Sequence, residues 1–199
     1  PGLRGDDLKQ AAEAIRQRQV GRMPLVGCTR QNKPIIERSF HELLAILDSF
    51  ATRDEFIFGT RPSLADFGLF GQLKTLASDH TSMLIMRNTV PSVYDWVRRL
   101  EDSSGIEGEW HEFADMRPAV SELLKFSARY YLPFLEANAN AHAEGADTLT
   151  VELAGRIFQQ PTFKYQVKCY DRLRKLLQNE RADALRGLLA ETECLQYLE

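Results

Sequence analysis

Hydrophobic residues recur along most of the chain every three or four positions, the spacing that places them on one face of an α-helix. The clearest stripe follows Lys33-Pro34, and proline is favoured in the first turn of a helix, so we predict that a helix begins there. The residues that this helix is predicted to bury are Ile35, Ile36, Phe40, Leu43, Leu44, Leu47 and Phe50. A weaker stripe predicts an earlier helix over residues 7–22, which a proline and a glycine in residues 23–27 end.

The same spacing predicts further helices in the rest of the chain. Their ranges are 63–77, 82–87, 91–100, 118–138, 165–178 and 181–190. The first of them is expected to bury a face made of Leu64, Phe67, Phe70, Leu73 and Leu76. Pro133 lacks the amide hydrogen that its turn of helix would use, so we expect a kink there.

Residues 148–164 show a different pattern, in which apolar and polar residues alternate before a glycine and a proline. This alternation predicts a short two-stranded β-ribbon. The predicted fold class is therefore all-α, a helical bundle with at most this minor β element. The polar run at 101–105 is typical of an exit loop. It predicts a helical domain over 1–102 and a helical extension, 103–199, packed on that domain.

Composition narrows the possible functions. The 199 residues contain 25 Lys plus Arg against 28 Asp plus Glu, a formal charge of −3, so we expect no nucleic-acid partner. The longest apolar runs are far shorter than the roughly 20 residues that span a bilayer, so we expect no membrane partner. The three widely spaced cysteines favour reduced thiols and a cytoplasmic location. Because the chain starts at Pro1 without an initiator methionine, we expect a piece of a longer protein.

Templates for catalysis fail on their spacing. The sequences that begin at His41 and His111 resemble the start of a zinc-protease helix, but each lacks the second histidine one turn later. A zinc-deaminase start at His142 has no cysteine pair after it. Cys169 follows Lys168, yet neighbours on a helix point in different directions, so a structural thiol is the preferred interpretation. We therefore predict no metal site and name no catalytic residue.

The most informative local motif is the stretch Gly59-Thr60-Arg61-Pro62-Ser63-Leu64-Ala65-Asp66-Phe67. Ser63 and Asp66 have the spacing of a capping box, in which each side chain accepts a hydrogen bond from the other residue's amide. An acid is also favoured there by the positive end of the helix dipole. The motif predicts a structural role for both residues at the start of a helix.

With its surroundings, this motif resembles the all-helical C-terminal domain of the glutathione S-transferase superfamily. The matching pieces are residues 36–48, residues 56–69 around Ser63 and Asp66, and the segment Val90-Pro91-Ser92-Val93-Tyr94-Asp95-Trp96-Val97-Arg98-Arg99-Leu100. Their order and spacing are those of the family, and the similarity covers about residues 7–102. The resemblance implies that Ser63 and Asp66 begin a central buried helix.

The resemblance also implies a partner domain, to which no part of these 199 residues is similar. In the superfamily, an N-terminal thioredoxin-like domain holds glutathione and supplies the residue that stabilises its thiolate. We expect such a domain in the parent protein, with glutathione as co-substrate, and a homodimer is a further expectation. The first helix lines the ligand cleft in the family, so Arg18 and Arg22 are candidates to contact an anionic substrate, although a solvated face is the preferred interpretation.

Two functions remain open at this point. In the first, the chain is the helical part of a glutathione S-transferase-like enzyme, contributes the electrophile pocket and scaffold, and is inactive by itself. In the second, the helical fold is a non-catalytic module that binds another protein, since a fold used so widely does not fix function.

Overall fold

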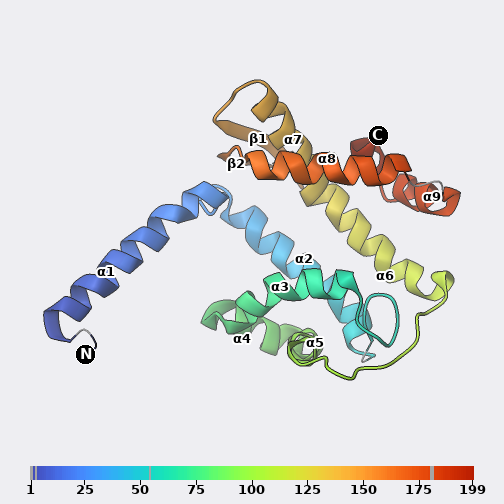
Figure 1. Cartoon of the computed structure of the whole chain (residues 1–199), viewed down its shortest axis with the longest axis horizontal. Helices are drawn as coiled ribbons and strands as arrows, with labels where there is room; N and C mark the ends of the chain where they lie inside the picture. Colours follow the sequence, from blue (N-terminus) through green and yellow to red (C-terminus); the bar gives the residue numbers. More distant parts are fainter. Residues whose placement is uncertain (1, 3, 54, 180–181) are drawn as a thin grey trace. The chain divides into compact units, whose positions relative to one another are not determined.

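A computed structural model of the chain describes residues 2, 4–53, 55–179 and 182–199, and it is mainly helical (Figure 1). The elements are α1 (Gly5–Arg22), η1 (Met23–Val26), α2 (Lys33–Ala51), α3 (Leu64–Ser78), α4 (His80–Thr89), α5 (Pro91–Glu101), α6 (Phe113–Phe126), η2 (Ser127–Tyr131), α7 (Leu132–Ala143), β1 (Thr148–Leu153), β2 (Arg156–Pro161), α8 (Lys164–Asn179), α9 (Asp183–Glu191) and α10 (Leu195–Leu198). The prediction of an all-α fold with one short β-ribbon is confirmed. Within the described ranges, no helix has the length and apolar character needed to cross a bilayer.

Contacts divide the chain into two compact units that alternate along the sequence. The ribbon unit comprises Pro1–Arg38, Arg129–Arg181 and Tyr197–Glu199, and the core unit comprises Ser39–Ala128 and Ala182–Gln196. This division by contact differs from the boundary at residue 102 that the polar run predicts, and that boundary stays a prediction. The 103–128 part of the predicted extension belongs to the core unit, where Ala119, Val120 and Leu123 pack against its hydrophobic cluster.

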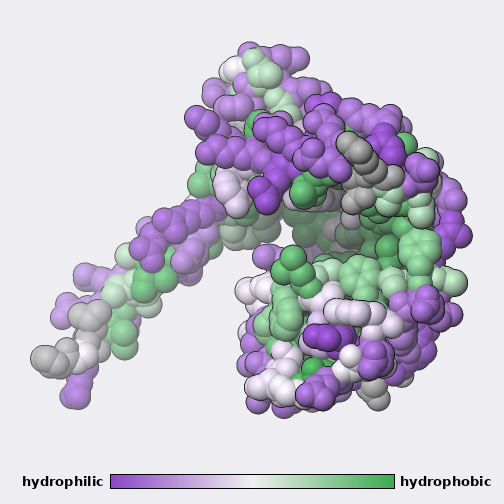
Figure 2. Space-filling view, turned by 45° about the vertical axis from the view of Figure 1, so that its right-hand side comes forward, coloured by the Kyte–Doolittle hydropathy of each residue, from purple (hydrophilic) through white to green (hydrophobic). Residues whose placement is uncertain are grey.

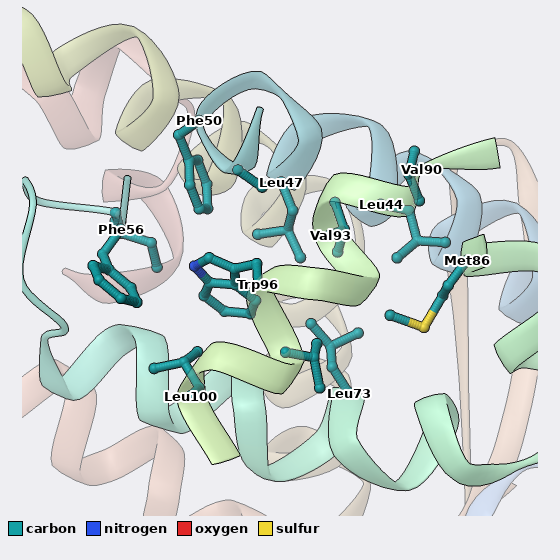
Figure 3. Packing of buried hydrophobic residues seen from close by; sticks show 13 residues of the cluster. Leu44, Leu47, Phe50, Phe56, Leu73, Met86, Val90, Val93, Trp96 and Leu100 are labelled. Atoms are coloured by element: carbon teal, nitrogen blue, oxygen red, sulfur yellow. The ribbon is translucent and has the colours of Figure 1, made fainter. Parts of the chain in front are cut away.

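The core unit is built around a cluster of buried side chains from α2, α3, α4 and α5 (Figure 3). Trp96 is at its centre, fully buried, with its ring edge-to-face against Phe50 at a centroid distance of 6.0 Å. Its indole Nε1 has no hydrogen-bond partner among the described residues. Burial of each large apolar side chain contributes about 1.5–3 kcal/mol, so packing outweighs the cost of that one unpaired donor.

In the ribbon unit, β1 and β2 pair as an antiparallel hairpin in which Leu149 faces Gln160 and Leu153 faces Arg156.

Two buried asparagines hold the chain at and just beyond β2, each by pairing with both backbone groups of one residue. Asn32 Nδ2 donates to Gln159 O at 2.7 Å, while its Oδ1 accepts from Gln159 N at 3.1 Å. Asn138 makes the same pair of bonds with Phe163, at 3.0 and 2.8 Å. The side-chain amide of each asparagine thus satisfies backbone groups that a further strand would otherwise pair.

The structure corrects the predicted buried face of α3. Leu64 and Phe67 are 88% and 42% exposed, whereas Leu73 and the polar Asp66 are buried. The helix has apolar residues on several sides, so its spacing alone did not identify the face that packs. Ile36 of α2 is also exposed, although Ile35, Leu44, Leu47 and Phe50 are buried as predicted.

The helix predicted over 118–138 is instead three consecutive elements, α6, η2 and α7. Residues 127–131 form a π-helical turn, and Pro133 then lies in the first turn of α7. A proline there needs no amide partner, so the wider turn before it takes the place of the predicted kink within a continuous helix. The predicted start at residue 181 of the last predicted helix, 181–190, lies outside the described residues, and α9 begins at Asp183.

The turn of the hairpin gives a stability test. Ala154 and Gly155 both have positive φ, 50° and 78°, as a two-residue hairpin turn requires. Alanine is strained in this region and asparagine tolerates it, so Ala154→Asn is expected to raise the free energy of unfolding by about 0.5–1 kcal/mol. Gly155→Ala is the matched variant and is expected to lower the free energy of unfolding, because a side chain is strained at this positive φ. Urea titration followed by circular dichroism measures both, and a lower midpoint for Ala154→Asn would contradict the assignment of the turn.

Candidate functional site

The start of α3 is organised by the buried carboxylate of Asp66. Its Oδ2 accepts from the Ser63 amide at 2.8 Å and from the Ser63 hydroxyl, and the Asp66 amide donates back to Ser63 Oγ at 3.4 Å. Both halves of a capping box are therefore present. The other oxygen, Oδ1, accepts from the Ile57 amide at 2.9 Å. Asp66 thus connects the cap of α3 to the turn that precedes it, a connection that a capping motif alone does not imply.

The turn held by Asp66 is closed on its other side by the segment around Trp110. Thr60 N donates to Glu109 O at 3.0 Å, and His111 N donates to Phe58 O at 2.9 Å. A Cβ on Gly59 would lie 2.2 Å from Glu109 O, so only glycine permits this approach. Arg61 lies over the Trp110 ring at 4.9 Å. These contacts fix the path of the loop.

Arg18 and Arg22, the predicted ligand contacts, lie one turn apart near the end of α1. Positions four apart share a helix face, so both guanidinium groups can point in one direction. Both are exposed, and α1 buries none of its residues. Within the part of the chain that the structure describes, neither arginine has a hydrogen-bond or ion-pair partner. The pair is thus free to meet an anionic group, and equally free to be solvated.

A cavity of about 390 Å³ lies just after these arginines in the sequence, in the connection between α1 and α2. We call it the α1–α2 pocket. Its lining residues come from η1, the following turn and the first turns of α2: Met23, Cys28, Thr29, Arg30, Lys33, Ile36 and Glu37. No local sequence motif marks this pocket, because it depends on how the turn after η1 folds back.

The turn under the pocket is held by Gly27 and Asn32. Gly27 has a φ of 73°, and a Cβ there would lie 2.7 Å from Phe158 Cζ. The side-chain Nδ2 of Asn32 donates to Gly27 O at 2.7 Å, and the backbone N–H of Asn32 donates to Thr29 Oγ1. Since Asn32 also pairs with Gln159, the turn is attached to β2 and the pocket is formed before any ligand binds.

Tyrosine and cysteine side chains are further titratable groups whose surroundings the structure describes. Burial raises the pKa of Tyr131, and the neighbouring Cys169 and Tyr165 raise it further, so this phenol stays protonated at neutral pH. The described residues include no group of three or more histidine, cysteine, aspartate or glutamate side chains placed to hold a metal ion. The three thiols are free: Cys28 is exposed, Cys169 is half-buried and Cys194 is buried. Burial raises the pKa of the Cys194 thiol, whose Sγ lies 3.2 Å from Leu124 O.

Comparison with known proteins agrees with the helical architecture and the Asp66 motif. Residues 11–99 match the family described as "Glutathione S-transferase, C-terminal domain". This stretch, slightly less than half of the chain, is similar to the helical domain of that family and includes both Ser63 and Asp66. Searches of curated proteins and of solved structures found no match to the chain.

The Asp66 contacts predict an order of stabilities. Ser63→Ala is expected to cost about 1 kcal/mol, the usual value for an N-cap. Asp66→Ala leaves the buried amides of Ile57 and Ser63 unpaired, so its expected cost is about 2–4 kcal/mol. The exposed Asp95→Ala is the control and is expected to change little. Equal urea midpoints for the Ser63 and Asp66 variants would show that the Ile57 bond adds no stability.

The thiols predict an order of reactivity. In the native chain at pH 7.5, iodoacetamide is expected to modify Cys28 first and Cys194 last. A raised pKa keeps the Cys194 thiol protonated, and only 1% of its surface is exposed, so it should react more than about tenfold more slowly than Cys28. Peptide mass spectrometry at timed intervals measures each site. Urea-unfolded protein gives the reference rate of each thiol. Comparable rates of modification at Cys28 and Cys194 in the native chain would contradict the burial of Cys194.

Proposed function

We propose that this chain is the helical C-terminal part of a glutathione S-transferase-like protein. The observation that carries the proposal is the family match over residues 11–99, together with the Asp66 box at the start of α3. The free cysteines support a reducing, cytoplasmic setting.

The proposed division of labour follows from the chemistry of thiol conjugation. An N-terminal thioredoxin-like domain of the same parent would hold glutathione and stabilise its thiolate, with the tripeptide acting as co-substrate. The helical part would supply the scaffold and one wall for the electrophile, a contribution through proximity and orientation. Arg18 and Arg22 are the proposed contacts for an anionic group on the electrophile, because both are exposed, unpaired among the described residues and on one helix face.

One observation favours a second candidate, a protein-binding module with the same fold. Helix α1 exposes Leu8, Ile15 and Val20, each about half accessible to solvent. Figure 2 shows hydrophobic surface along this helix between hydrophilic residues. Apolar side chains on an otherwise unburied helix suit a protein partner, including a second copy of the chain in a homodimer.

The enzymatic proposal is tested by glutathione conjugation. The isolated chain is expected to give no turnover with 1-chloro-2,4-dinitrobenzene above the uncatalysed rate. The longer protein, including whatever segment precedes Pro1 in its coding sequence, is expected to conjugate this electrophile. In it, exchanging both Arg18 and Arg22 for glutamine should raise KM for the anionic 4-chloro-3,5-dinitrobenzoate by about tenfold and leave KM for the neutral electrophile unchanged.

The controls separate the two candidates. Arg156→Gln, an exposed charge on β2, serves as the matched charge control in the same protein. Robust turnover by the isolated chain would contradict the assignment of chemistry to another domain. A preceding segment without a thioredoxin-like fold, combined with no turnover, would favour the binding module.

A further inference from the structure

Helix α8 of the ribbon unit presents a straight row of exposed side chains on one face (Figure 1). We call this row the α8 stripe, and it consists of Tyr165, Lys168, Arg172, Lys175 and Asn179. Successive members are alternately three and four positions apart, which is the spacing of the contact seam between two helices that lie side by side. On the other side of α8, Tyr170 and Leu177 are buried, so the helix is held in the fold by that side and offers the stripe outward.

A hollow of about 400 Å³ follows the stripe, and the charge of its lining is positive. The lining residues are Lys168, Asp171, Arg172, Lys175, Leu176 and Asn179. Three cations and one carboxylate give this lining a net charge of +2, in a protein whose formal charge is −3. Apolar surface flanks the cations along the helix, because Tyr165 is 75% exposed and Leu176 is 56% exposed. The surface thus combines a positive middle with an apolar contact toward each end.

The three cations of the stripe are not neutralised within the chain. Among the described residues, none of them has a hydrogen-bond or ion-pair partner. Asp171 precedes Lys175 by four positions, a spacing at which helical ion pairs form, yet these two side chains do not pair. On other exposed helices, lysines pair with an acid one turn away, as in Lys9–Asp6, Lys33–Glu37 and Lys125–Glu122. The positive charge of the α8 stripe is therefore available to a partner.

We propose that the α8 stripe is a docking surface for an acidic helix of a partner protein. A helix that lies along α8 repeats its side chains at the same spacing, so glutamates on one of its faces meet Lys168, Arg172 and Lys175. Apolar residues toward the two ends of that face contact Tyr165 and Leu176. At 1.5 Å per residue the stripe is about 21 Å long, so about four turns of a partner helix cover it.

The charges of the stripe favour this partner over two others. The α8 stripe of a second copy would bring like charges together, which opposes association. A nucleic-acid strand would place phosphates beside the carboxylate of Asp171, whereas a protein partner also carries N–H donors that this carboxylate can accept. The stripe lies outside residues 11–99, which match the family, and docking requires neither glutathione nor another domain. The proposal therefore does not depend on the proposed function.

Two helical peptides that differ only in charge test the proposal on the chain itself. Each has about 20 residues, an acetylated N-terminus and no lysine, because shorter helices are marginal in water. One carries glutamates at alternate spacings of three and four on one face, with a leucine at each end of that face, and the other has glutamine in place of glutamate. Fluorescence anisotropy at low salt is expected to show at least about tenfold tighter binding of the glutamate peptide.

Substitutions in the stripe separate its charges from those of the rest of the chain. Arg172→Gln is expected to weaken binding of the glutamate peptide by about threefold, since one exposed pair contributes little. Exchange of Lys168, Arg172 and Lys175 together for glutamine should weaken it by about thirtyfold. The matched control, Arg156→Gln, removes an exposed charge on β2 and should stay within about twofold. Unchanged thermal midpoints verify that the variants fold.

Acylation of lysines locates the contact on the unaltered chain. With the glutamate peptide at ten times its Kd, about one molecule in eleven is free, so an N-hydroxysuccinimide ester of acetic acid should modify Lys168 and Lys175 about tenfold more slowly. Lys9 of α1, with 81% of its side chain exposed, is the internal control and should keep its rate. Peptide mass spectrometry at timed intervals measures each lysine.

The outcomes are separate. Protection of Lys168 and Lys175 but not of Lys9, together with weaker binding by the variant that lacks the three cations, supports the docking surface. Absence of binding at millimolar peptide would overturn the proposal, as would binding that protects neither lysine of the stripe. Equal effects of Arg172→Gln and Arg156→Gln would also overturn it. Tighter binding of a single-stranded oligothymidylate that carries as many charges as the glutamate peptide would overturn it in favour of a nucleic-acid partner.

Discussion

One buried carboxylate connects three parts of the core unit. Asp66 accepts hydrogen bonds from the amides of Ile57 and Ser63 and from the Ser63 hydroxyl, and it is fully buried. A buried charge is tolerated only where hydrogen bonds replace its hydration, and here backbone donors supply them. The direction of α3 and the path of the preceding turn are therefore fixed together, and the cluster around Trp96 packs between elements already set in place.

In the ribbon unit, neutral side chains take the role that the Asp66 carboxylate has in the core unit, and they pair with backbone groups. Asn32 and Asn138 are fully buried, and each offers one donor and one acceptor to a single residue of the chain at or beyond β2. An isolated two-stranded hairpin is only marginally stable in water, so these side-chain bonds and the packing of β1 on α7 are what hold it. The same Asn32 shapes the α1–α2 pocket, which makes the pocket a consequence of how the hairpin is anchored.

The structural box and the candidate sites of the matched stretch use different residues. The matched stretch, residues 11–99, carries the structural box, which explains the fold and performs no chemistry. Arg18 and Arg22 of α1 and Arg30 of the pocket are exposed and have no hydrogen-bond or ion-pair partner among the described residues. Fold and binding therefore depend on separate residues, and substitutions can test them independently.

The sequence by itself determined the helical class, most of the helices, the ribbon and the Ser63–Asp66 spacing, because these follow from periodicity and local hydrogen-bonding capacity. The buried face of α3, the π-helical turn before Pro133 and the pairing of Gly59 with the Trp110 segment were decided by tertiary structure. The α1–α2 pocket belongs with them. The buried face of α3, the Gly59 pairing and the turn under the pocket, which Asn32 bonds to Gln159, depend on which surfaces meet across long stretches of chain. A pattern of neighbouring residues carries no information about that choice.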